Sequence, residues 1–435
     1  MLASGPYPTL SVSYTTPTPT IRSWAYLGWY DQGATTARQL RIDTDQVTGI
    51  YDGVTVTEAD IAPKVGGTSY GNSYGTRQWQ QGAYTNDLVN LNSSYFYNAV
   101  HENAVTYCCV YVYNAKGSSI TGAYLGIGSD DSCKVWWNGT VVGSDVVGRG
   151  VAADSDFWGP VTINNGWNRL MVKVENGGTG HGVYARFANA NRTALTDKSY
   201  LSFYTTDATA PSVPTSLAVS VVTSGVWQNT VAAPTFTWTS GTDSQGSGQG
   251  VSGVRGQKYY FGASSSGSPG TFQTGVSYAP GTQADGAYYF KVDAVDYALN
   301  ESSAATFTFL YDATAPTGVS LGFGTVTTNS ITVTGSATDA HSGINAATGY
   351  NYSRAGASNS GAKGATHTWT GLDANTEYTN LLVTVSDQVS PTPNTAASSA
   401  QSKWTLSVPP AAGPTGSTCS APRKQPCWAS GTLGR

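Results

Sequence analysis

The sequence has little charge: Asp, Glu, Lys and Arg make up 11% of its 435 residues, against about 25% in an average soluble protein. Basic nucleic-acid binders, charge-rich coiled coils and acidic tails need dense or one-signed charge, and the net charge of −4 does not supply it. The sequence also lacks an apolar run of the ~18 residues that a membrane-spanning helix requires. We therefore expect no nucleic-acid partner and no membrane insertion.

Cysteines are few, and their positions do not form a disulfide framework. There are five, an odd number, and the adjacent Cys108 and Cys109 would point to opposite faces of a strand. No pair has a neighbouring His at the spacing of a structural zinc site. We expect buried free thiols, while Cys419 and Cys427 could pair near the C-terminus.

Motifs of catalysis are also missing. The sequence has no Gly-x-Ser-x-Gly, no phosphate-binding P-loop and no His-Glu-x-x-His. His101 and Glu102 lie together in a polar segment beside a strand-like run, where solvation explains them better than catalysis. We expect a protein that is not an enzyme and has no cofactor apart from a structural Ca²⁺; an Asp pair acting as a glycosidase acid and base stays an open alternative.

What the sequence does have favours β structure. It contains 51 Gly, 19 Pro and 27 Tyr, residues that suit turns and half-buried pleated surfaces. Apolar residues do not recur at the 3.6-residue spacing of a helix over any sustained stretch. These features predict an all-β protein with few helices.

An exact internal repeat divides the chain. Residues 207–211 and 312–316 both read Asp-Ala-Thr-Ala-Pro, 105 residues apart, and each repeat lies between strand-like runs. Because Pro fixes its own backbone and restricts the residue before it, the repeat is typical of a stiff connector between domains. The predicted parts are an extended N-terminal arm at 1–20, domains at 21–207, 208–312 and 313–407, and a Pro/Gly/Ser-rich tail or linker at 408–435.

The two repeated domains resemble a known family. Gly371-Leu372 followed by Thr376 and Tyr378 is similar to the Gly-Leu-x-x-x-Thr-x-Tyr corner of fibronectin type III modules. Residues 295–302 resemble the closing Asp-x-x-Gly-Asn-x-Ser segment of related bacterial and phage immunoglobulin-like modules, with Leu299 in place of Gly. Residues 243–254 and 339–344 resemble the Asp-x-x-Ser-Gly turn of the same modules. The resemblance implies two tandem immunoglobulin-like/fibronectin type III-like sandwiches, which serve as spacers or as binding modules.

The N-terminal region carries a second set of motifs. Asn138-Gly139 supplies the two positive φ angles of a type I′ turn and predicts a β-hairpin. That hairpin, together with Gly-Ser-Asp-Asp at 128–131, Gly-Trp-Asn-Arg-Leu-Met-Val-Lys-Val at 166–174 and Arg-Phe at 186–187, resembles the jelly-roll accessory domain found beside bacterial glycoside hydrolases and in surface proteins. The resemblance implies a jelly-roll β-sandwich that is carbohydrate-associated and non-catalytic.

Aromatic residues of this region are the predicted glycan contacts. Trp136 and Trp137 are neighbours in a strand, so one ring should face the core and the other should face outward, where an indole can stack on a sugar. The alternative is that a second sheet or a partner subunit covers the outward ring. Further candidates on the same argument are Trp79, Tyr84, Trp158 and Tyr184.

Acidic residues of the same region suggest a metal site. Asp130, Asp131, Asp154 and Asp156 could bind Ca²⁺, because hard oxygen ligands from two loops suit that ion. The alternative is an Asx-type turn in which a carboxylate accepts backbone N–H bonds.

Two functional hypotheses follow. The first is a virion protein, of the bacteriophage minor tail or fibre type, assembled in the host cytoplasm as a homo-oligomer, in which the jelly roll contacts a host glycan. It is favoured by an N-terminus without a signal-peptide pattern, by unpaired cysteines and by the Pro/Thr-rich arm. The alternative is a secreted or cell-surface adhesin, or a carbohydrate-binding accessory module of a larger enzyme.

Overall fold

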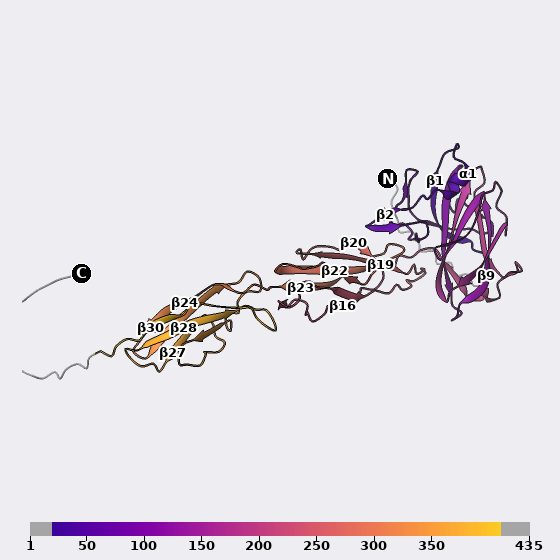
Figure 1. Ribbon diagram of the computed structural model, residues 1–435. Helices are drawn as coiled ribbons and strands as arrows, with labels where there is room; N and C mark the ends of the chain where they lie inside the picture. Colours follow the sequence, from indigo (N-terminus) through magenta and orange to yellow (C-terminus); the bar gives the residue numbers. More distant parts are fainter. Residues whose placement is uncertain (1–19, 410–435) are drawn as a thin grey trace, which may run out of the picture. The chain divides into compact units, whose positions relative to one another are not determined.

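The computed structural model describes residues 20–409, which divide into two compact units (Figure 1). The first unit contains the residues up to 226 together with 230–311, and the second contains 227–229 together with the residues from 312 onward. We call 20–206 the N-terminal domain, 207–311 the first module and 312–409 the second module. The predicted pairing of Cys419 with Cys427 and nearly all of the predicted arm and tail lie outside the described residues.

The N-terminal domain is built almost entirely from strands. Its elements are β1 (Ser23–Asp31), α1 (Arg38–Asp43), β2 (Gly49–Tyr51), β3 (Val54–Val56), β4 (Tyr70–Asn72), β5 (Gly75–Arg77), β6 (Gln80–Ala83), β7 (Val89–Asn90), β8 (Ala104–Asn114), β9 (Ile120–Asp130), β10 (Ser132–Trp137), β11 (Thr140–Asp145), β12 (Asp156–Ile163), β13 (Gly166–Asn176), β14 (Gly182–Ala188), a short 3₁₀ helix (Thr196–Tyr200) and β15 (Leu201–Tyr204). Two antiparallel sheets, ordered β11-β10-β13-β8-β1-β6 and β12-β9-β14-β7, pack into a sandwich, and β15 also pairs with β8.

The larger sheet of this domain is buried on both faces. On one face, Cys108 and Val110 belong to the core between the two sheets. On the other, Tyr107 and Cys109 pack beneath residues of the segment 47–79, which includes the hairpins β2–β3 and β4–β5. Strand β8 is accordingly apolar along almost its whole length, as expected for a strand covered on both sides. The prediction that Cys108 and Cys109 are buried free thiols on opposite faces is confirmed.

The predicted Asn-Gly hairpin is present between β10 and β11. Asn138 has φ 49° and Gly139 has φ 80°, and the two strands pair in antiparallel register on either side of the turn. The Asn138 side chain supports it, because its Oδ1 accepts a hydrogen bond from the Arg169 backbone N–H at 2.8 Å. This local prediction from the sequence is therefore confirmed.

The first module is a smaller sandwich. Its strands are β16 (Thr215–Val219), β18 (Phe236–Thr239), β19 (Val254–Gly262), β20 (Thr271–Gln273), β21 (Ser277–Tyr278), β22 (Gly286–Asp296) and β23 (Ala305–Tyr311). One sheet is ordered β16-β18-β21, and the other contains β23-β22-β19-β20. Phe236 and Phe290 stack between them with ring centroids 4.4 Å apart.

The first module is packed tightly against the N-terminal domain. Val295 and Leu299 belong to the same hydrophobic cluster as Trp79 and Trp136. Arg255 forms an ion pair with Asp60 at 3.0 Å. Because the two share a core cluster, the connector around residue 207 is held in place on both sides.

The second module repeats the sandwich in a separate unit. Its strands are β24 (Thr317–Val326), β25 (Ser330–Thr338), β26 (Tyr350–Ser353), β27 (Thr366–Thr370), β28 (Glu377–Ser386), β29 (Thr395–Ala397) and β30 (Gln401–Trp404), and the two-residue β17 (Trp227–Gln228) belongs to this unit. The sheets are ordered β24-β25-β27 and β26-β28-β29, with β30 also on β28. The Tyr378 hydroxyl accepts a hydrogen bond from the Asp373 backbone N–H at 2.8 Å, which closes the corner that the fibronectin-like motif predicts.

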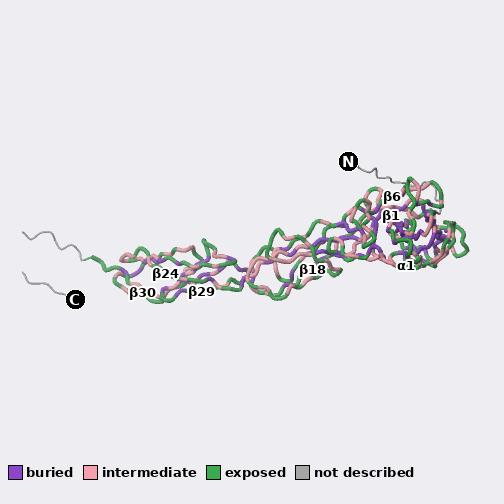
Figure 2. The backbone as a smooth tube through the Cα atoms, turned by 90° about the horizontal axis from the view of Figure 1, so that it is seen from above, coloured by how far each residue is buried: buried purple, intermediate pink, exposed green. Residues whose placement is uncertain are grey.

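The all-β fold class is confirmed by these three sandwiches. Buried residues are densest in the N-terminal domain, whereas the second module has more intermediate and exposed positions (Figure 2). Within residues 20–409, no helix has the length and apolar character needed to cross a membrane.

Candidate functional site

Trp136 and Trp137 do not form an exposed stacking surface. Their exposed fractions are 3% and 5%. Trp137 lies in the core between the sheets, where its indole N–H donates to the Thr162 carbonyl at 2.8 Å. Trp136 points to the other face, as the strand alternation predicts, but the segment 47–79 covers it. The prediction of an outward-facing indole on β10 is therefore wrong, because that sheet has no free face at this position.

The other predicted aromatic contacts differ in how far they are covered. Trp79 and Tyr184 are buried, with exposed fractions of 1% and 6%, which is a second correction. Tyr84 and Trp158 are half-buried and pack against the core between the sheets. Of the six predicted residues, only these two leave part of the ring available to a ligand.

Three of the four predicted calcium ligands are paired with arginines. Asp131 contacts Arg38 at 2.7 Å, Asp154 receives a hydrogen bond from Arg186 Nε at 2.9 Å, and Asp156 is paired with Arg149. Burial raises the pKa of Asp131, but hydrogen bonds from Arg38 and from two backbone N–H groups lower it overall.

Groups of three acidic or other ligand-bearing side chains do occur within residues 20–409, and none of them includes these four aspartates. Guanidinium groups already neutralise three of the carboxylates, so the calcium prediction at Asp130, Asp131, Asp154 and Asp156 is wrong. Asp131 also accepts backbone N–H bonds from Arg149 and Gly177, each at 2.8 Å, as the alternative turn prediction requires.

His101 and Glu102 are not arranged as an acid–base pair. The His101 ring stacks on Trp29 with centroids 3.4 Å apart, and the Arg77 guanidinium lies 4.9 Å from the same indole. Burial and the nearby Arg77 charge lower the pKa of His101. Glu102 is exposed. The histidine is thus a packing element of this stack, and the geometry gives the pair no shared substrate position.

Tyr95 is the most exposed large aromatic side chain of the described N-terminal domain, with 55% of its surface accessible. It lies in the loop between β7 and β8, and its ring meets that of Tyr84 edge to face with centroids 5.9 Å apart. The Tyr84 backbone N–H donates to the Arg22 carbonyl at 2.9 Å, and Arg22 pairs with Asp87 at 2.7 Å. We call Tyr84, Tyr95, Arg22 and Asp87 the Tyr95 surface.

The Tyr95 surface has the chemistry of a sugar-contacting site. An exposed ring can stack on the C–H face of a sugar, while a guanidinium and a carboxylate bond its hydroxyl groups. The sequence argument found Tyr84 but missed Tyr95. The available signal was an aromatic residue in a polar Asn/Ser-rich loop, a place where function is more common than packing.

Comparisons with known proteins give a sequence relative among carbohydrate-active enzymes and solved structures of fibronectin type III domains. No model of a known protein family matches the chain. Exoglucanase B of Cellulomonas fimi is 32% identical over 275 residues, which cover 60% of this chain and 24% of the exoglucanase. The chain therefore spans about a quarter of that relative's length.

Solved structures give fold-level neighbours only. The fibronectin(III)-like modules of Clostridium thermocellum CbhA are 15% identical, with TM-score 0.23, over 44% of this chain and 94% of that one. Chicken CNTN1 FN1–FN3 domains are 13% identical, with TM-score 0.24, over 68% and 97%. At these TM-scores the likeness adds nothing to the sandwich architecture described above.

Proposed function

We propose that this chain is a non-catalytic accessory region of a carbohydrate-active protein that works outside the cell, with glycan contact on its N-terminal domain. The observation that carries the proposal is the 32% identity to Exoglucanase B over 60% of this chain. Because the match involves 24% of the exoglucanase and this chain consists of β-sandwiches of a kind that serves as spacer or binding module, we take the shared part to be an accessory region.

The Tyr95 surface supplies the contact in this proposal. Tyr95 offers an accessible ring without exposing the core, and Tyr84 supports that ring from the side. Trp136 and Trp137 are unsuitable contacts because they are buried.

The test is binding of the full chain to insoluble cellulose and to a panel of soluble polysaccharides. Tyr95→Ala should weaken binding about two- to tenfold, which corresponds to about 0.5–1.5 kcal/mol for one aromatic contact. The matched control is Tyr200→Ala, since Tyr200 is 45% exposed and belongs to none of the aromatic pairs found among the described residues. Equal binding by both variants, or no polysaccharide binding by the native chain, would overturn the proposal.

The competing virion hypothesis loses one of its arguments. Burial raises the pKa of Cys109 and of Cys133 to about 12, so these thiols are protonated and shielded and persist in an oxidising environment as well as in the cytoplasm. The gene neighbourhood distinguishes the two: a tail-assembly cassette supports the virion hypothesis, and a neighbouring or fused glycoside hydrolase supports the accessory region.

A further inference from the structure

Two clusters of three aspartates lie at equivalent places in the two modules. In each cluster, one carboxylate oxygen of every residue lies within 4.8 Å of those of the other two. One member begins the repeated Asp-Ala-Thr-Ala-Pro connector, one lies in the Asp-x-x-Ser-Gly turn, and one lies at the end of the long central strand or just after it. The first cluster is Asp207, Asp243 and Asp296, and the second cluster is Asp312, Asp339 and Asp387.

The hydrogen bonds around the connector aspartate are duplicated. Asp207 Oδ2 accepts from the Ser252 backbone N–H at 2.7 Å, and Asp312 Oδ2 accepts from the Ser342 backbone N–H at 3.0 Å. In each cluster, the connector aspartate thus accepts a hydrogen bond from the equivalent serine of the Asp-x-x-Ser-Gly turn.

The third aspartate of each cluster is held in the same way. Asn300 Nδ2 donates to Asp296 Oδ2 at 2.7 Å, and Asn394 Nδ2 donates to Asp387 Oδ2 at 2.6 Å. The donors are neutral amides in both modules. Among the described residues, none of the six carboxylates takes part in an ion pair within 4.0 Å. Each cluster therefore concentrates negative charge without a cationic side chain in direct contact, although the charge of Lys64 acts on Asp207.

Unpartnered polar atoms lie at both clusters. Asp243 Oδ1 is buried and accepts no hydrogen bond. Ser342, only 6% exposed, has a buried hydroxyl with no hydrogen-bond partner, although its own backbone N–H bonds Asp312. Buried polar atoms are rarely left unsatisfied in folded proteins, since each carries a desolvation penalty. These atoms point to a ligand that each cluster is built to receive.

We propose that each cluster binds one Ca²⁺ ion. Calcium takes oxygen ligands at about 2.3–2.6 Å in flexible geometry, so two ligands on opposite sides of the ion are about 4.6–5.2 Å apart. The carboxylate oxygens of each cluster all lie within 4.8 Å of one another, so they are close enough to bind one ion together. Magnesium needs shorter bonds of about 2.0–2.1 Å in near-ideal octahedral geometry, which three carboxylates from separate loops match less well.

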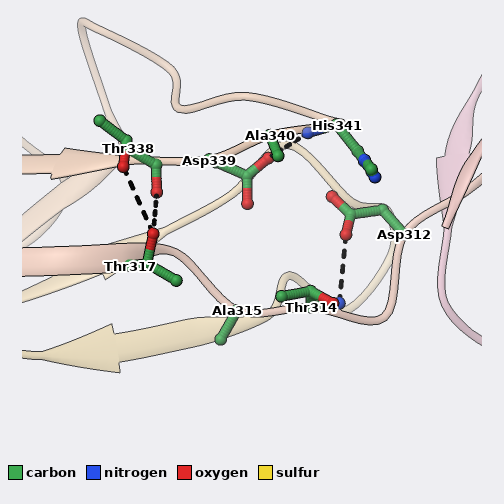
Figure 3. Close-up of a pocket in the computed structure, with 8 residues that line it drawn as sticks. All are labelled: Asp312, Thr314, Ala315, Thr317, Thr338, Asp339, Ala340 and His341. Carbon is green, nitrogen blue, oxygen red and sulfur yellow. Dashed lines mark hydrogen bonds between the residues drawn. The ribbon is translucent and has the colours of Figure 1, made fainter.

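The second cluster also has room for water ligands. A small pocket is lined by Asp312, Asp339, His341 and neighbouring residues of the same module. Figure 3 shows the carboxylates of Asp312 and Asp339 reaching this pocket from two separate segments. Because calcium completes its shell with water and backbone carbonyls, the pocket gives the ion access and supplies part of its coordination.

The carboxylates of the first cluster repel one another. Burial and the Asp207 charge raise the pKa of Asp243 to about 6. Burial, with the charges of Asp207 and Asp243, raises the pKa of Asp296 to about 7. A divalent ion removes this repulsion and ties the connector aspartate to two loops of its own module, a role separate from glycan contact.

The test is calcium titration of the full chain after treatment with EDTA, followed by calorimetry and native mass spectrometry. We expect two bound ions with dissociation constants on the order of 10⁻⁴–10⁻³ M, the range of extracellular calcium modules. Asp243→Asn and Asp339→Asn should each abolish one site, and the double variant should bind none. Asp197→Asn is the matched control, because Asp197 is an acidic residue paired with Lys116 at the surface.

Three outcomes would contradict the calcium assignment. Absence of saturable calcium binding by the native chain, retention of both ions in the double variant, or equal affinity for Mg²⁺ would overturn the assignment. Circular dichroism of every variant in EDTA checks that the fold persists. If a variant fails to fold, the number of calcium ions bound by the native chain still tests the assignment.

Discussion

Buried carboxylates have different partners in the N-terminal domain and in the two modules. In the N-terminal domain, fully buried Glu175 lies 2.7 Å from Arg41 and 3.0 Å from Arg38, and Glu58 lies 2.7 Å from buried Lys173. In the modules, Asp207 and Asp296 are equally buried but receive hydrogen bonds from backbone and side-chain amides. The N-terminal domain thus carries its own counter-charges, whereas the modules leave this role to an external cation.

Removing an internal counter-charge should have the largest effect on stability. Lys173→Met leaves Glu58 buried beside the Tyr107 hydroxyl with only the distant Lys134 ammonium, 3.9 Å away. We expect a loss of about 3–5 kcal/mol in the free energy of unfolding, as for other buried pairs broken on one side. Urea unfolding followed by tryptophan fluorescence measures it.

The double variant Lys173→Met/Glu58→Gln serves as the control for that experiment, since it removes both charges and should recover much of the loss. A single variant as stable as the native chain would show that the pair does not compensate Glu58, and the contrast between the two regions would weaken.

Local features of this fold were predictable from the sequence, and features made by distant segments were not. The Asn138-Gly139 turn depends on two adjacent residues, and the Tyr378 corner on a contact five residues away. The burial of Trp136 depends instead on the segment 47–79 folding over the outer face of the sheet. Strand alternation places the two indoles on opposite faces, but it carries no information about what covers each face.

The acidic clusters could not be predicted from the sequence for the same reason. The sequence contains each of the motifs that supply them, including the repeated connector, but in the sequence these motifs indicate only the fold. Their convergence on one point follows from the packing of a connector, a turn and a strand end that are far apart along the chain. Conversely, Asp130 and Asp131 are adjacent in the sequence and suggest a metal site, but in the structure Arg38 of α1 forms an ion pair with Asp131.

His181 is a buried titratable group of the N-terminal domain. Neither of its ring nitrogens has a hydrogen-bond partner among the described residues. Burial, with a smaller effect of His101, lowers its pKa to about 3. The ring lies over Tyr97 at 6.1 Å. The folded pKa lies below the usual value of about 6.5. The neutral His181 side chain therefore makes its full contribution to the free energy of unfolding above pH 6.5, and this contribution is lost as the pH falls toward 3.

His181→Leu should therefore flatten the acid side of the stability profile. The expected change in slope is at most about 1.4 kcal/mol per pH unit between pH 6.5 and 3, measured by urea unfolding at a series of pH values. Native and variant profiles that run parallel over this range would show that His181 becomes protonated in the folded protein.

Neutralising one member of a cluster should have the opposite sign to breaking an N-terminal ion pair. In EDTA, Asp243→Asn removes a like charge beside Asp207 and Asp296 and should stabilise the chain by about 0.5–2 kcal/mol. In calcium the order should reverse, because the native chain gains the ion and the variant does not. Thermal unfolding in both buffers measures the crossover, and a variant less stable than the native chain in EDTA would contradict it.

Tyr95→Ala should have the smallest effect on stability, within about 0.5 kcal/mol, because surface substitutions away from the core rarely cost more. Its ring is 55% exposed and contacts Tyr84 at its edge, so little buried area is lost. A variant that keeps the native unfolding midpoint but loses polysaccharide binding would separate recognition from stability. If its midpoint falls as far as that of Lys173→Met, then Tyr95 is part of the structural core and the glycan contact must be sought on another surface of the N-terminal domain.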